Sequence, residues 1–104
     1  MDVKNRIKIE KKIVRTAVNS LFEIDGVEMS IMESDTPATT NKRKVLKEIF
    51  EYDKATVSIS KNGVDIGYVE FTFDNGLYDV ISSYPEPLYQ ELKKAIELSK
   101  TYLP

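Results

Sequence analysis

The residue types that most often carry catalysis are missing from this chain of 104 residues, which contains no cysteine and no histidine. Without them there is no thiolate nucleophile, no imidazole to activate a serine and no usual set of zinc ligands. Ser82 and Ser83 therefore lack a histidine base, and the four glycines stand singly rather than in a phosphate-binding loop. We expect a protein that is not an enzyme and that needs no cofactor and no metal.

Carboxylates offer the remaining route to acid–base chemistry. Asp74 and Asp79 flank the Asn75-Gly76 pair, and neighbouring carboxylates can exchange protons with a substrate or hold a divalent cation. In a two-residue hairpin loop, however, these two side chains fall on opposite faces, and Asp74 is explained as a turn residue. An enzyme that works with carboxylates, lysine or tyrosine is therefore the least favoured class.

Cations near the N-terminus follow a helical spacing. Five of them form one stripe, almost opposite the apolar stripe of the same segment: Lys4, Lys8, Lys11, Lys12 and Arg15. Such a stripe can bind nucleic-acid phosphates, or it can be the solvated face of an amphipathic helix. Because this segment has no aromatic residue to stack on bases, nucleic-acid binding is an alternative rather than the leading hypothesis.

Charge is distributed unevenly along the chain. Residues 1–15 carry six cations and two acids, residues 23–35 carry five acids and no base, and residues 65–79 carry four acids and no base. This asymmetry favours association with a charged partner or self-association. The alternative, which we favour, is that the charges protect strand edges from unwanted pairing.

Aromatic residues are concentrated in the second half of the chain. Four are predicted to lie in the core rather than on a stacking platform: Phe71, Phe73, Tyr78 and Tyr84. Three tyrosines are predicted to be partly exposed and are candidates for contact with a partner, since tyrosine is enriched in interfaces: Tyr68, Tyr89 and Tyr102.

Three dipeptides predict the hairpins that position these residues, because both central residues of a two-residue loop need positive φ: Asp25-Gly26, Asn62-Gly63 and Asn75-Gly76. Each loop brings apolar residues to one face, pairing Phe22 with Met29, Ile24 with Val27, Ile59 with Ile66, Val57 with Tyr68, Phe71 with Val80, and Phe73 with Tyr78. The apolar parity changes at Gly67, which predicts a β-bulge near this residue; the alternative is that both faces of the strand are covered, and either interpretation predicts a central strand.

Helical periodicity accounts for the rest of the chain. We expect helices from Val3 to about Asn19 with Asp2 as the N-cap, from about Asn41 to Glu51, and after Pro85 and Pro87. The residues expected to face inward are Val3, Ile7, Val14, Ala17, Val18, Val45, Leu46, Ile49, Phe50, Leu88, Leu92, Ala95, Ile96 and Leu103. The loop from Ser34 to Thr40 is polar and is predicted to be mobile.

These elements predict one α+β domain over residues 1–104, in the order α-ββ-α-βββ-α. Its antiparallel sheet has about five strands, with helices packed mainly on one face. No segment approaches the ~18 uninterrupted apolar residues of a membrane helix, and no secretory signal is present, so we expect a cytoplasmic protein without membrane contact.

The stretch from Ile66 to Tyr84 contains a G-x-V-x-F strand, an N-G turn and a D-V-I-S-x-Y strand. It resembles a group of small uncharacterised bacterial and prophage-type proteins, and the similarity extends upstream to Leu46–Phe50 and the first hairpin. Members commonly have Asp where this chain has Ser83, which removes one candidate acid. The resemblance implies no activity, but it favours a phage or mobile-element origin.

The leading hypothesis is a non-enzymatic interaction module that presents a surface to a protein partner. Its features are the absent catalytic residue types, the uneven charge and the tyrosines. Nucleic-acid binding through the basic stripe is the alternative, and a dimeric chaperone-like adaptor, in which the partner is a second copy, is the second alternative.

Overall fold

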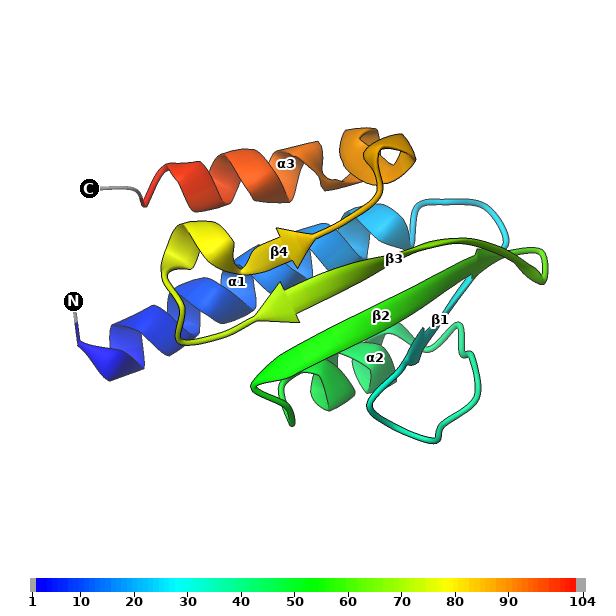
Figure 1. The fold of residues 1–104 in the computed structure, drawn as a ribbon, viewed down its shortest axis with the longest axis horizontal. Coiled ribbons are helices and arrows are strands. Elements are labelled where there is room, and N and C mark those ends of the chain that lie inside the picture. The colour runs from blue at the N-terminus through cyan, green and yellow to red at the C-terminus, as the bar shows by residue number, and fades with distance from the viewer. Residues whose placement is uncertain (1, 103–104) are drawn as a thin grey trace.

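The computed structural model describes residues 2–102, apart from the side chain of Tyr78. Its helices and strands follow the order α1 (Val3–Leu21), β1 (Val27–Ile31), α2 (Lys42–Ile49), β2 (Lys54–Lys61), β3 (Val64–Thr72), β4 (Ile81–Ser83) and α3 (Tyr89–Lys100) (Figure 1). The strands form one antiparallel sheet in the order β1-β2-β3-β4. An α+β domain is confirmed, with four strands rather than about five in the described part.

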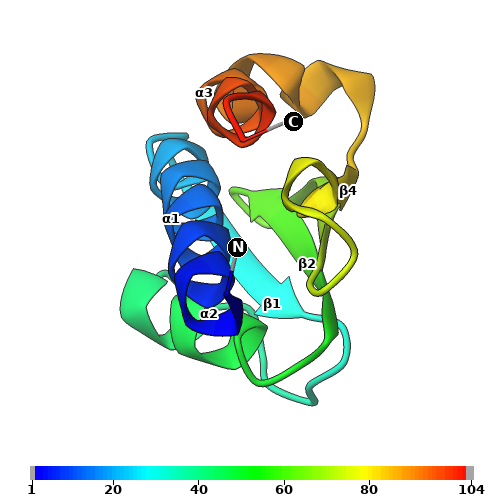
Figure 2. The ribbon, with the colours of Figure 1, turned by 90° about the vertical axis from the view of Figure 1, so that its left-hand side faces the viewer.

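All three helices lie on one side of the sheet, and the other side is open (Figure 2). Burial along the strands follows this arrangement, because alternate residues of β1 and β2 are buried beneath the helices. The core joins strand residues such as Val57 and Phe71 to helix residues such as Val14, Ile49 and Leu92. No helix among residues 2–102 combines the length and apolarity needed to cross a membrane.

The first predicted hairpin, at Asp25-Gly26, is wrong. Helix α1 continues to Leu21, and Phe22 caps it in helical geometry with its N–H donated to the Val18 carbonyl at 2.9 Å. Strand β1 pairs instead with β2, with Met29 opposite Ile59. The reason is that Leu21 continues the apolar stripe of α1 and is fully buried, which outweighs the local turn signal.

The second hairpin and its bulge are confirmed. Asn62 and Gly63 have positive φ of 51° and 80°, and Lys61 pairs with Val64 as predicted. Ser60 pairs with Asp65 and Ile59 with Gly67, which leaves Ile66 as the extra residue of the bulge. The predicted pairs of Ile59 with Ile66 and of Val57 with Tyr68 are therefore wrong by one residue.

The third predicted hairpin is present as a pair of antiparallel strands, but its predicted two-residue loop is wrong. Strands β3 and β4 are antiparallel neighbours, but a 3₁₀ turn at Leu77–Asp79 lies between them, and Phe71 pairs with Ile81 rather than with Val80. Positive φ falls on Asp74 and Gly76, at 66° and 100°. The 3₁₀ turn lets Leu77 and Val80 both be buried, which a two-residue loop does not allow.

The predicted helices are confirmed with small changes at their ends. The Asp2 carboxylate accepts the Asn5 N–H at 2.7 Å, and Asn41 accepts the Lys44 N–H at 3.1 Å, as N-caps do. Helix α3 follows a 3₁₀ turn at Glu86–Leu88. The expectations for Leu103 and for the Tyr78 side chain lie outside the described residues.

Two inward-facing predictions on α1 are wrong, because Val3 and Ile7 are 60% and 42% exposed. They continue the apolar stripe toward the helix N-terminus, yet the first turns of α1 extend past the ends of β2 and β3 (Figure 1). The sheet therefore does not cover them. This uncovered stretch of an amphipathic helix leads to the candidate site.

Candidate functional site

A hollow of about 350 Å³ lies beside the first turns of α1. We call it the α1 hollow. Its apolar lining consists of Val3, Ile7, Phe50, Tyr52 and Phe73, and its charged lining consists of Arg6, Glu10, Lys11, Asp53 and Asp74. It thus joins three segments that are far apart in the sequence, namely the start of α1, the connection from α2 to β2, and the turn after β3.

Two aromatic rings form one side of the α1 hollow. Phe50 caps α2, Phe73 directly follows β3, and their ring centroids lie 5.9 Å apart. The Phe73 N–H donates to the Asp53 carbonyl at 3.0 Å, which fixes the turn that carries the ring. The Lys11 ammonium lies 5.4 Å from the centre of the Phe50 ring, within reach of a cation–π interaction.

A polar cluster ties α1 to the turn after β3. Glu10 is only 4% exposed, and one of its carboxylate oxygens accepts the Asp74 N–H at 3.0 Å. The Arg6 guanidinium donates to the Asp74 carboxylate and forms an ion pair with it. Asp74 is therefore held through its backbone and its side chain, which accounts for its positive φ.

Two of the three acids that line the α1 hollow are engaged in contacts within the protein. Glu10 and Asp74 are already engaged, the first by a backbone N–H and the second by a guanidinium. Asp79 accepts a hydrogen bond from the Asn75 side chain at 3.2 Å and shares no partner with Asp74. Within residues 2–102, no three His, Cys, Asp or Glu side chains come together in a group that could hold a metal ion.

The five cations of the basic stripe are all exposed on α1. None of them forms an ion pair among residues 2–102. Of these five cations, Lys11 lines the α1 hollow together with Val3 and Ile7. Lys11 follows Ile7 by four residues, which is about 40° of helix rotation, so the stripe meets the apolar face at Lys11.

The three candidate tyrosines do not form one surface. Tyr68 is 47% exposed and points to the open side of the sheet, opposite the buried Val69. Tyr89 begins α3 and stacks on Tyr84, with ring centroids 6.4 Å apart. Tyr102 packs partly against the core beyond the other end of α3, about 20 Å along the helix axis from Tyr89.

The aromatic residues predicted for the core differ in depth. Phe71 is fully buried, whereas Phe73 and Tyr84 are only partly buried against the core. The core interpretation is therefore confirmed outright for Phe71. Phe73 has a second role, because the part of its ring that the core leaves uncovered lines the α1 hollow.

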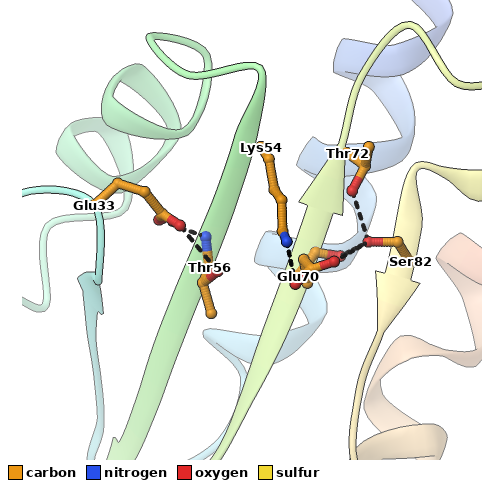
Figure 3. Close-up of polar contacts among 6 residues, drawn as sticks. All are labelled: Glu33, Lys54, Thr56, Glu70, Thr72 and Ser82. Atoms are coloured by element: carbon orange, nitrogen blue, oxygen red, sulfur yellow. Dashed lines mark hydrogen bonds and ion pairs between the residues drawn. The ribbon is translucent and has the colours of Figure 1, made fainter.

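Polar side chains connect the strands across the open face of the sheet (Figure 3). Glu33, beyond the end of β1, accepts the Thr56 N–H at 2.7 Å and the Thr56 hydroxyl at 3.0 Å. Glu70 forms an ion pair with Lys54 at 3.3 Å and accepts the Ser82 hydroxyl at 3.0 Å, as a second group on the same face.

These contacts give the polar side chains of the open face a structural role, because they link neighbouring strands. The Ser82 oxygen also lies 2.8 Å from the Thr72 hydroxyl, so it is placed among strand-to-strand contacts. The Glu70 carboxylate beside it is bound to Lys54, which opposes its use as a base for Ser82. Through their side chains, these contacts join β2, β3 and β4 near the ends of the strands, in addition to the backbone pairing.

Local features modify the backbone pairing of two strands, β1 at an edge of the described sheet and β3 inside it. At the β1 edge, Met29 and Thr39 exchange backbone hydrogen bonds of 3.0 and 2.8 Å. In β3, which lies between β2 and β4, the bulge at Ile66 interrupts the pairing with β2, and the Asp65 carboxylate accepts the Gly67 N–H at 2.9 Å. The bridge to Thr39 occupies the β1 edge at Met29 and discourages another chain from pairing there.

The sequence interpretation missed the α1 hollow and the role of Glu10. Glu10 lies three residues after Ile7 and four before Val14, so an acid stands within the apolar stripe of the helix. That position is a readable signal, since a charge on a buried face needs a partner. The partner, the backbone of Asp74, is 64 residues away in the sequence and is not readable from it.

Comparison of the chain with protein-family models, with curated proteins and with solved structures finds no match. Function is therefore argued from the geometry of the α1 hollow.

Proposed function

We propose that this protein is a non-enzymatic, cytoplasmic interaction module that binds a protein partner through the α1 hollow. The observation that supports this proposal is the exposure of Val3 and Ile7 beside the rings of Phe50 and Phe73. Covering the exposed parts of Val3 and Ile7 would contribute about 1 kcal/mol each. An accessory role in a phage or mobile element is a refinement of this proposal that rests on the sequence resemblance alone.

A selection from a displayed library of random peptides of about 12 residues tests this proposal. We expect peptides with apolar side chains to be enriched on the native protein, because these side chains can enter the α1 hollow. Ile7→Glu should abolish their binding. Met32→Glu is the matched control, since Met32 is 65% exposed at the end of β1 and does not line the hollow.

Equal binding to the native protein and to Ile7→Glu would contradict the proposal, as would the absence of any enriched peptide. Loss of binding in Met32→Glu alone would indicate that the peptides bind to the open face of the sheet. Thermal unfolding of each variant is the control for folding, and we expect both to remain folded because both substituted side chains are exposed.

Nucleic-acid binding is a second candidate, favoured by five exposed cations that form no ion pair in the described part of the chain. It requires that Lys8→Glu combined with Lys12→Glu abolish binding to a DNA duplex with little change in thermal stability. Lys93→Glu combined with Lys94→Glu on α3 is the matched control. Binding that survived the α1 double substitution, or that depended little on salt, would exclude the stripe.

A further inference from the structure

Two Asn-Gly pairs lie in turns of this protein, Asn62-Gly63 and Asn75-Gly76, and both asparagines are exposed. Asparagine is a thermolabile residue. Its side-chain carbonyl carbon can be attacked by the backbone nitrogen of the next residue, and glycine hinders this attack least because it has no Cβ. The two pairs share this local chemistry, so a difference in reactivity between them must come from the fold.

The fold restrains Asn62. It is one of the two residues of a closed hairpin loop, with φ of 51°, and Lys61 and Val64 pair directly beside the loop. The Asn62 N–H donates to the Gly26 carbonyl at 2.9 Å, and the Asn62 side chain packs so closely on Gly26 that an added Cβ there would overlap it. Rotating Asn62 toward the Gly63 nitrogen therefore disturbs these contacts.

The fold restrains Asn75 less. Within residues 2–102, the N–H groups of Asn75 and Gly76 donate to no backbone carbonyl. The Asn75 side chain makes one hydrogen bond in this part of the chain, from Nδ2 to the Asp79 carboxylate at 3.2 Å. That bond involves the nitrogen that leaves during the reaction and not the carbonyl carbon that is attacked. The Asp79 N–H donates to the Gly76 carbonyl at 3.0 Å, which does not engage the Gly76 nitrogen.

We propose that Asn75-Gly76 is a site of spontaneous deamidation in the folded protein and that the fold protects Asn62-Gly63. The Gly76 nitrogen attacks Cγ of Asn75, and the new N–C bond closes a succinimide ring. The bond from Cγ to Nδ2 breaks, and Nδ2 leaves as ammonia with the proton of the Gly76 N–H. Water then hydrolyses the ring at either carbonyl, which gives aspartate or isoaspartate at position 75. No oxidant, reductant or cofactor takes part.

The modification adds a negative charge to the turn beside the α1 hollow. The new carboxylate replaces the amide that donates to Asp79, and two carboxylates at that separation repel each other. The isoaspartate product also lengthens the main chain by one carbon between residues 75 and 76. Both products therefore alter the turn that carries Asp74. The inference does not depend on the proposed function.

The test follows the two asparagines separately in the purified full-length protein, kept in mildly alkaline buffer below its unfolding temperature. Peptide mapping by mass spectrometry measures the replacement of the amide nitrogen by oxygen at each position over time. A parallel sample in guanidinium chloride is the unfolded reference. The variants are Asn75→Gln and, as the matched control, Asn62→Gln, because the longer glutamine side chain disfavours closure of the ring.

We expect Asn75 to convert about tenfold faster than Asn62 in the folded protein, a factor that one restraining hydrogen bond can supply. In guanidinium chloride the two rates should become similar, since both sites then have the same local chemistry. Asn75→Gln should remove most of the mass gain of the intact protein, whereas Asn62→Gln should leave that gain unchanged.

Equal conversion of the two asparagines in the folded protein would overturn the inference, as would faster conversion of Asn62. It is also overturned if Asn75 stays intact in the folded protein over the time in which the unfolded chain reacts. A preference for Asn75 that persists in guanidinium chloride would overturn the role of the fold, because the selectivity would then belong to the local sequence.

Discussion

Glu10 determines the geometry of the α1 hollow at the residue scale. It is buried in the apolar stripe of α1, and its carboxylate accepts the backbone N–H of Asp74. The Asp74 side chain returns to α1 through Arg6, so the turn and the helix are joined twice. The buried acid therefore acts as a structural anchor, and the surface above it is left to the apolar side chains and the lysines.

Removing this anchor should destabilise the protein. We expect Glu10→Ala to lower the free energy of unfolding by about 1–2 kcal/mol, because the Asp74 N–H loses its acceptor. Glu10→Gln keeps an acceptor oxygen and should cost about half as much, since a neutral acceptor is weaker than a charged one. Urea unfolding measures both, and a larger loss for Glu10→Gln would contradict the anchoring role.

Glycine is required at position 67 by the backbone conformation and by the close approach of Pro85. Its φ is 140°, and an added Cβ would lie 2.8 Å from Cγ of Pro85. Gly67→Ala should cost about 2–4 kcal/mol, from backbone strain together with overlap. Gly63→Ala is the control, since its φ of 80° is also positive but no atom lies within 4 Å of the added Cβ. It should cost about 1 kcal/mol, and equal losses in chemical denaturation would exclude the steric role of Pro85.

At the scale of elements, prediction from the sequence succeeded where the signal was local. The N-cap Asp2 and the Asn62-Gly63 turn depend on residues within three or four positions of one another. The bulge near Gly67 was readable because the apolar parity changes there.

The failures depend on tertiary packing. Asp25-Gly26 has a hairpin signature, yet burial of Leu21 extends the helix toward it. Asn75-Gly76 has the same signature, but burial of both Leu77 and Val80 requires a 3₁₀ turn. For the same reason the sequence could not show that the sheet ends before Val3 and Ile7, because the end of a sheet is fixed by partners distant in the chain.

The exposed start of α1 depends on its N-cap, since no strand covers it. Asp2→Ala removes the acceptor of the Asn5 N–H and should lower stability by about 1 kcal/mol. Asp2→Ser retains a capping oxygen and should restore most of it. Because fraying would displace Val3, affinity for the selected peptide should fall together with helix content by circular dichroism. Unchanged peptide affinity in a frayed Asp2→Ala variant would show that the first turn is not part of the interface.

At the scale of the whole molecule, the β1 edge is bridged by Thr39, and the exposed Ile7 of α1 lies beside Lys11, which forms no ion pair within residues 2–102. We therefore expect a monomer near the formula mass of 11.9 kDa in size exclusion coupled to light scattering. The mass should be the same at low and high salt and should not change when a DNA duplex is added. A dimer at both salt concentrations would favour the adaptor alternative, and a salt-sensitive shift with DNA would favour the basic stripe.

The most direct test of the central claim is an NMR titration of the isotope-labelled protein with the strongest selected peptide. The account predicts that the largest amide shift changes occur at Ile7 and Lys11 of α1 and at Phe73 and Asp74 in the turn after β3, because these residues line the α1 hollow. Changes centred on Ser58, Tyr68 and Thr72, with α1 unaffected, would place the interface on the open face of the sheet and contradict the account.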